Sequence, residues 1–199
     1  MKWINPQLQE QVNTLAKKYQ EAKPYPHIQI SEFLREDKFE ELVRALSQLS
    51  FTHKESDLFS LAQTPELATV DDETIQSFLT FMNSQELRDW FEQVTGVSTN
   101  PGKLDCFGAI YQDSDYLLCH DDQLEERKIA WILYLTTLTV DQGGALALYT
   151  DNNGPDKKVK AYQPIANSIA FFTVSPKSWH EVEEVTDETS RVSIGGWLL

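Results

Sequence analysis

The amino-acid sequence predicts a mainly β protein with flanking α-helices, in which a double-stranded β-helix (jelly-roll) core carries N-terminal helices on its outer sheet. In the first half of the chain, apolar residues recur at helical spacing. From residue 105 onward the pattern changes to period two, with many β-branched and aromatic residues. Short strands separated by turns favour a jelly-roll, and helices with apolar stripes need a surface to cover.

The N-terminal half should be helical. Asn5 and Pro6 resemble an N-cap and first-turn pair, and a helix is expected from there to Ala22, where a proline-containing break follows. A short strand is expected at 27–30. Further helices are expected at 36–49, 71–82 and 84–94.

The C-terminal half should form eight strands separated by turns rich in Asp, Asn, Gly and Pro. Residues 116–119, which directly precede His120, are typical of a buried strand. The expected strands are 105–112, 116–120, 128–137, 144–150, 159–163, 168–174, 180–185 and 191–198.

Residues 52–70 lack a clear periodicity. A loop of this length is either a surface connector or a lid over a site, and both interpretations remain open.

Length and composition favour one domain spanning residues 1–199, with a helical support region at 1–100 and the jelly-roll at 105–199. The net charge of −14 argues against direct binding of nucleic acid, which relies on clustered Lys and Arg. It suits a soluble enzyme, including one with a basic macromolecular substrate.

The expected location is the cytoplasm. Cys106 and Cys119 lie in strand-like segments and are expected to be reduced, buried thiols. The N-terminus has no signal-peptide core, and the longest apolar run, 129–135, is too short to span a bilayer, so no membrane partner is expected.

The residues that indicate chemistry are His120, Asp122 and His180. Two imidazoles and one carboxylate can hold one face of a non-haem Fe(II) ion and leave the other face open. If His120 and Asp122 lie on a strand, they share a face and Asp121 points away, so Asp121 is the expected non-ligand. Taken alone, His120 could equally be a histidine of a surface turn.

Arg191 follows the second histidine in a strand-like run, where its side chain shares a face with Ser193. A buried guanidinium needs an anion, and its planar fork suits a carboxylate, with Ser193 as a second donor. A structural salt bridge is the alternative for Arg191. Tyr111 and Tyr134 are candidate donors to the same anion.

Three tryptophans in the C-terminal half are expected to be core residues rather than part of a binding surface. They are Trp131, Trp179 and Trp197.

Together these motifs resemble the 2-oxoglutarate and Fe(II)-dependent dioxygenases. Within them the chain is most similar to the prolyl hydroxylase branch, especially the enzymes that 3-hydroxylate a proline of a small-subunit ribosomal protein. Those enzymes carry a second, catalytically silent copy of the fold, and the resemblance here covers the catalytic copy alone. It is carried by residues 120–122, 127–135, 143–149, 175–176, 180 and 191–197, together with 56–59.

The resemblance implies that His120, Asp122 and His180 bind Fe(II) and that Arg191 pairs with the distal carboxylate of 2-oxoglutarate, which Tyr111 and Tyr134 also contact. It implies 2-oxoglutarate and O₂ as co-substrates, ascorbate as a candidate accessory reductant, and a proline-containing protein or peptide as substrate. Two alternatives stay open. One is the same chemistry on a free amino acid or small metabolite, and the other is a non-enzymatic jelly-roll module that binds Zn²⁺ or a sugar.

Overall fold

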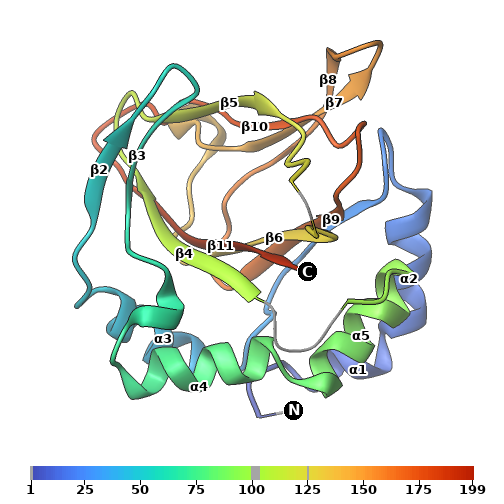
Figure 1. The fold of residues 1–199 in the computed structure, drawn as a ribbon, viewed down its shortest axis with the longest axis vertical. Coiled ribbons are helices and arrows are strands. Elements are labelled where there is room, and N and C mark those ends of the chain that lie inside the picture. The colour runs from blue at the N-terminus through green and yellow to red at the C-terminus, as the bar shows by residue number, and fades with distance from the viewer. Residues whose placement is uncertain (1, 100–103, 125) are drawn as a thin grey trace.

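A computed structural model describes residues 2–99, 104–124 and 126–199 of the chain. A layer of helices lies against one side of a two-layered β-structure (Figure 1). The helices are α1 Gln7–Glu10, α2 Val12–Glu21, α3 Glu36–Leu46, α4 Glu73–Met82 and α5 Gln85–Thr95, with 3₁₀ turns at Leu67–Thr69 and Val140–Gln142.

The strands form a single antiparallel sheet that folds back on itself. Its order is β1-β9-β6-β11-β4-β3-β5-β10-β7-β8, and β2 pairs with β3 at the side. Because β3 pairs with both β4 and β5, it joins the two layers. The strands are β1 His27–Ile30, β2 Thr52–Glu55, β3 Phe59–Gln63, β4 Leu104–Tyr111, β5 Tyr116–His120, β6 Ile129–Tyr134, β7 Leu146–Asp151, β8 Pro155–Tyr162, β9 Ser168–Thr173, β10 His180–Val182 and β11 Arg191–Leu198.

The helices cover the outer face of the layer β1-β9-β6-β11-β4, as predicted. Phe171 on β9 is the centre of this contact: its ring lies 5.0 Å from that of Phe91 on α5 and 5.6 Å from that of Tyr19 on α2. Trp131 on β6 meets Phe78 on α4. The main hydrophobic core therefore lies between helices and sheet, and the jelly-roll with helices on its outer sheet is confirmed.

Helix boundaries follow local hydrogen bonding. The side chain of Asp72 accepts a hydrogen bond from the backbone N–H of Ile75, so α4 begins at Glu73 and not at the predicted residue 71. Ser84 caps α5 in the same way. The single helix predicted up to Ala22 is divided at Gln11 into α1 and α2.

The two interpretations of residues 52–70 were both incomplete. The segment contains β2 and β3, which form a hairpin, and β3 continues into the main sheet through the pairs Ala62↔Ile110 and Phe59↔Leu117. All four residues of β2 are exposed, so no alternation between apolar and polar positions marked it in the sequence.

The prediction that β5 is buried was wrong. Its residues are partly or fully exposed, and Leu118 retains 46% of its accessible surface. The helices cover the opposite layer, so no element formed by the described residues packs on the outer face of β5 (Figure 1).

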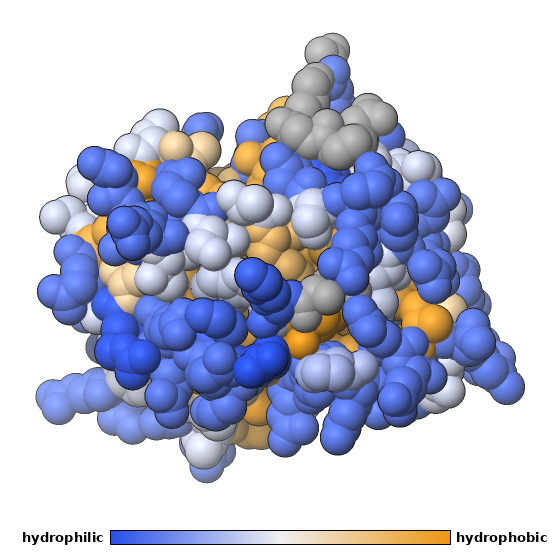
Figure 2. Space-filling view, turned by 90° about the horizontal axis from the view of Figure 1, so that it is seen from below, coloured by the Kyte–Doolittle hydropathy of each residue, from blue (hydrophilic) through white to orange (hydrophobic). Residues whose placement is uncertain are grey.

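The face that the helices present to solvent is mostly hydrophilic, with hydrophobic residues showing in small areas between polar ones (Figure 2). Among the described residues, no helix has the length and apolar character needed to cross a membrane.

Candidate active site

His120, Asp122 and His180 meet between the two layers of the sheet. His120 ends β5 and His180 begins β10, and the two are directly paired across these antiparallel strands. One ligand atom from each of the three residues lies within 4.8 Å of the other two. The Nε2 atoms of both histidines lie 3.4 Å from the Asp122 carboxylate oxygens.

Asp122 reaches this position by a different route from the one predicted. Strand β5 ends at His120, and Asp122 adopts a left-handed backbone conformation with φ of 62°. The turn, not strand alternation, brings its carboxylate back beside His120. Asp121 points elsewhere, as expected, and its side chain accepts a hydrogen bond from the backbone N–H of Gln123 at 3.1 Å.

Backbone carbonyls set the tautomer of both histidines. The Nδ1 atom of His120 lies 2.8 Å from the Leu118 carbonyl oxygen, and that of His180 lies 2.8 Å from the Ser178 carbonyl oxygen. A carbonyl only accepts, so each Nδ1 carries a proton, and Nε2 is the nitrogen of each ring that is directed at Asp122 and could bind a metal ion. This is the arrangement that histidine ligands of metals adopt.

The electrostatics of Asp122 favour its charged form. Burial acts to raise the pKa of the Asp122 carboxyl, but hydrogen bonds with the two histidines outweigh it and hold the pKa well below its usual range. Burial acts to lower the pKa of His120, and the interaction with Asp122 reverses this and raises it. Asp122 therefore remains an anion at neutral pH.

Arg191 lies at the other end of the same space and is almost completely buried. Its Nη1 donates to Ser193 Oγ at 3.2 Å, whereas its Nε and Nη2 have no hydrogen-bond partner in the part of the chain that the structure describes. No carboxylate among residues 2–99, 104–124 and 126–199 pairs with it, so the structural salt bridge is absent from the described chain. An unpaired interior cation is costly, and these free donors indicate an anionic ligand.

The two predicted tyrosines flank this guanidinium. Strand register places Tyr111 opposite Arg191 and Tyr134 opposite Ser193. The guanidinium carbon lies 4.8 Å from the centre of the Tyr111 ring and 5.1 Å from that of Tyr134. The Tyr134 hydroxyl is buried without a partner of hydrogen-bonding geometry in the described part of the chain.

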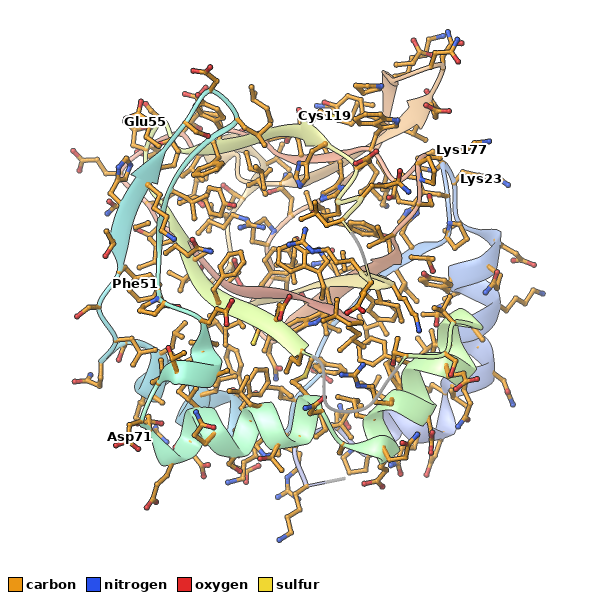
Figure 3. The ribbon with its side chains drawn as sticks, viewed as in Figure 1. Lys23, Phe51, Glu55, Asp71, Cys119 and Lys177 are labelled. Atoms are coloured by element: carbon orange, nitrogen blue, oxygen red, sulfur yellow. The ribbon has the colours of Figure 1, made fainter. Side chains whose placement is uncertain are left out.

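A cavity of about 320 Å³ connects the three-residue cluster with Arg191. Side chains from both layers enclose it, between the strand carrying Cys119 and the sheet that faces the helices (Figure 3). Apolar residues form most of its wall, including Leu58, Phe59 and Leu61 from β3 and the segment before it.

Arg127 and Trp197 line the cavity beside Asp122, and neither was assigned a role in the site from the sequence. Arg127 has its Nη1 3.5 Å from Asp122 and its guanidinium carbon 3.4 Å from the centre of the Trp197 ring. Trp197 was predicted to be a core residue. It packs against a buried cluster that includes Ala130 and Phe172, and it also lines the cavity, because it shares the inward face of β11 with Arg191 and Ser193. That alternation was readable in the sequence, whereas the position of Arg127, in a loop, was not.

Comparison with known proteins agrees with this site. Residues 106–199 match the family model of the 2OG-Fe(II) oxygenase superfamily. The chain is 40% identical over 180 residues to a mouse (Mus musculus) protein named prolyl 3-hydroxylase OGFOD1, covering 88% of this chain and 33% of that protein. It is 34% identical over 198 residues to a prolyl 3,4-dihydroxylase OGFOD1 of Ostreococcus tauri, covering 88% of this chain and 38% of that protein.

Solved structures share the fold. A Pseudomonas putida prolyl-4-hydroxylase superimposes with a TM-score of 0.70 at 18% identity, over 94% of this chain and 97% of that one. A Trichoplax adhaerens prolyl hydroxylase, solved with a peptide fragment of hypoxia inducible factor, superimposes with a TM-score of 0.73 at 16% identity. The match covers 97% of this chain and 90% of that one.

By these matches the chain resembles the 2OG-Fe(II) oxygenases, over residues 106–199 in the family model and over most of its length in the two relatives. It spans about a third of the length of the curated relatives it matches. Fe(II), 2-oxoglutarate and O₂ are the cofactor and co-substrates of such oxygenases, and the residues present fit them. Two imidazole nitrogens and a carboxylate suit Fe(II), and a guanidinium with no carboxylate partner among the described residues suits a dicarboxylate.

Proposed function

We propose that this protein hydroxylates a prolyl residue in a protein substrate, with a small-subunit ribosomal protein as the first candidate. One observation carries the proposal: an anionic cluster of His120, Asp122 and His180 and an unpaired Arg191 occupy opposite ends of one cavity. A metal ion would bind at the first of these ends, and a small diacid anion at the second. The names of the relatives support a prolyl substrate.

In this proposal His120 and His180 hold Fe(II) through Nε2, and Asp122 holds it through its carboxylate. Bound Fe(II) supplies the activation of O₂ that couples decarboxylation of 2-oxoglutarate to hydroxylation of a carbon. The backbone carbonyls of Leu118 and Ser178 keep both rings oriented for this. Arg127, beside Asp122, positions the carboxylate.

Arg191 binds the distal carboxylate of 2-oxoglutarate, and Ser193, Tyr111 and Tyr134 surround it. The Ser193 hydroxyl accepts from Arg191 and so keeps its own proton to donate. The apolar wall excludes water from the reacting atoms, which strengthens each of these electrostatic contacts.

The net charge of −14 suits encounter with a basic protein substrate. Cys106 and Cys119 are both free thiols, which supports the expected location in the cytoplasm.

The test is hydroxylation of peptides by the protein with Fe(II) and 2-oxoglutarate. Proline-containing peptides of a small-subunit ribosomal protein are compared with the same peptides carrying alanine for proline, and with free proline. We expect mass gain of one oxygen atom only in the proline peptides, with matching succinate release. Oxidation of free proline alone, or of a small metabolite alone, would refute a protein substrate. No metal-dependent succinate release with any of them would refute the enzyme.

A further inference from the structure

The floor of the cavity is built in rows across three strands. Side chains two residues apart on β11 face the cavity, and register sets their neighbours on β4 and β6. The rows, from one end to the other, are Tyr111 beside Arg191; Ala109, Ser193 and Tyr134; Phe107, Gly195 and Ile132; and Asp105, Trp197 and Ala130. All of these residues except Tyr134 and Asp105 line the cavity.

The candidate metal ligands lie over the Trp197 end of this floor. Arg127 bridges Asp122 and Trp197. The His180 ring lies 4.6 Å from that of Phe172, which is paired with Ala130 in the Trp197 row. The anion-binding donors of Arg191 and Ser193 lie at the other end. A ligand that spans both ends must therefore pass over Gly195.

Neither backbone strain nor crowding explains the glycine at position 195. Among the described residues, a Cβ built there has only the Trp131 carbonyl oxygen within 4 Å, at 4.0 Å, and the φ angle is not in the left-handed region. At the next residue, Gly196, a Cβ would lie 2.2 Å from the Asp105 carbonyl oxygen. Glycine inside a strand weakens it, so the fold by itself favours a larger residue at 195.

The spacing of the strand matches the length of the diacid. Antiparallel strands rise about 3.4 Å per residue, which puts Gly195 about 7 Å beyond Ser193 along β11. A five-carbon diacid measures roughly 5 Å between its carboxyl carbons, given C–C bonds of about 1.5 Å. A molecule whose distal carboxylate contacts Arg191 and Ser193 thus has its other end over Gly195.

We propose that Gly195 is a specificity-determining residue: its missing side chain leaves the room over the centre of β11 that the keto-acid end of 2-oxoglutarate occupies. This inference rests on the proposed function, because it takes 2-oxoglutarate as the spanning ligand. The residue at position 195 would then determine which length of diacid the cavity admits.

The test uses Gly195→Ala and Gly195→Val, with Ala161→Val as a control that adds a larger side chain to an exposed position on β8. Binding of 2-oxoglutarate to the Fe(II)-loaded protein is measured by calorimetry without O₂, alongside the melting temperature of the ligand-free protein. We expect the dissociation constant to rise about tenfold or more in Gly195→Val, less in Gly195→Ala and not in Ala161→Val. The melting temperature of Gly195→Ala should equal or exceed that of the wild type.

Wild-type affinity in a folded Gly195→Val protein would overturn this inference and leave the proposed function standing. A lower melting temperature for Gly195→Ala would also overturn it, since the glycine would then serve the fold. Absence of 2-oxoglutarate binding by the wild type would overturn both.

Discussion

Single residues determine the chemistry of the site through the groups they leave without a partner. Both histidines direct Nε2 at Asp122 because their Nδ1 protons are held by backbone carbonyls. Arg191 is buried, and two of its nitrogen atoms have no hydrogen-bond partner among the described residues. A buried cation of this kind costs folding free energy unless a ligand pairs with it.

Asp122→Asn should remove Fe(II) binding, whereas the neighbouring Asp121→Asn should not. Removing a residue that hydrogen-bonds to a metal ligand weakens metal binding roughly 10–100-fold. Removing the charge of a ligand itself should weaken metal binding further. The Asp121 side chain accepts a hydrogen bond from the Gln123 backbone N–H in the turn, and asparagine can accept the same hydrogen bond. Iron content after dialysis and succinate release measure the effect; equal loss in both variants would contradict the assignment.

Arg191→Gln should weaken 2-oxoglutarate binding without destabilising the ligand-free protein. Removing one partner of a buried charge pair costs about 2–5 kcal/mol, equivalent to a rise of roughly 30-fold or more in the dissociation constant. Since the guanidinium has no carboxylate partner among the described residues, its loss should not lower the melting temperature. Arg44→Gln, on the exposed face of α3, is the control. A marked fall in melting temperature for Arg191→Gln would indicate a structural role instead.

Among the elements, β11 joins the site to the core. Its inward residues line the cavity, and its outward residues, such as Ile194 and Leu198, pack in the main hydrophobic core beneath the helices. The position of Arg191 and Ser193 therefore depends on how tightly β11 packs against β4 and β6.

Gly196→Ala should test this dependence. The added Cβ would lie 2.2 Å from the Asp105 carbonyl oxygen and 2.6 Å from Cys106 Cβ, so β4 and β11 must move apart. Overpacking of this kind costs about 1–3 kcal/mol of unfolding free energy. Urea denaturation measures it, with Gly195→Ala, where the Cβ has open space, as the matched control; equal stability of the two variants would show that the strands can adjust freely.

In the whole molecule, ligand binding should be coupled to folding, because the two ends of the cavity come from both layers of the sheet. A ligand that binds only the folded state stabilises it by about 2.7 kcal/mol at a hundred times its dissociation constant.

Fe(II) and 2-oxoglutarate together should thus raise the melting temperature by roughly 5–10 °C, given about 2–4 °C per kcal/mol for a chain of this size. Thermal denaturation without O₂ measures the shift. EDTA should reverse it, and Asp122→Asn should not show it. A shift of equal size in that variant would mean that the ligands bind elsewhere.

Much of this molecule could be predicted from local sequence. The change from helical to alternating periodicity near residue 105 lies at the start of β4, although β1, β2 and β3 of the same sheet precede it, and β5 and β11 have the predicted bounds. His120, Asp122, His180 and Arg191 were selected by residue type and order. Predictions failed where periodicity was absent, as in β2, or where burial depended on which layer the helices cover, as in β5.

The sequence by itself determined the periodicity of the elements and the kinds of side chain available for a metal ion and an anion, because both are properties of neighbouring residues. Only the tertiary structure decided that a left-handed turn aims Asp122 at the histidines and that Arg127 lies between Asp122 and Trp197. It alone also showed that Gly195 faces open space while Gly196 does not. These features depend on contacts between residues far apart in the chain, which strand pairing and layer packing bring together.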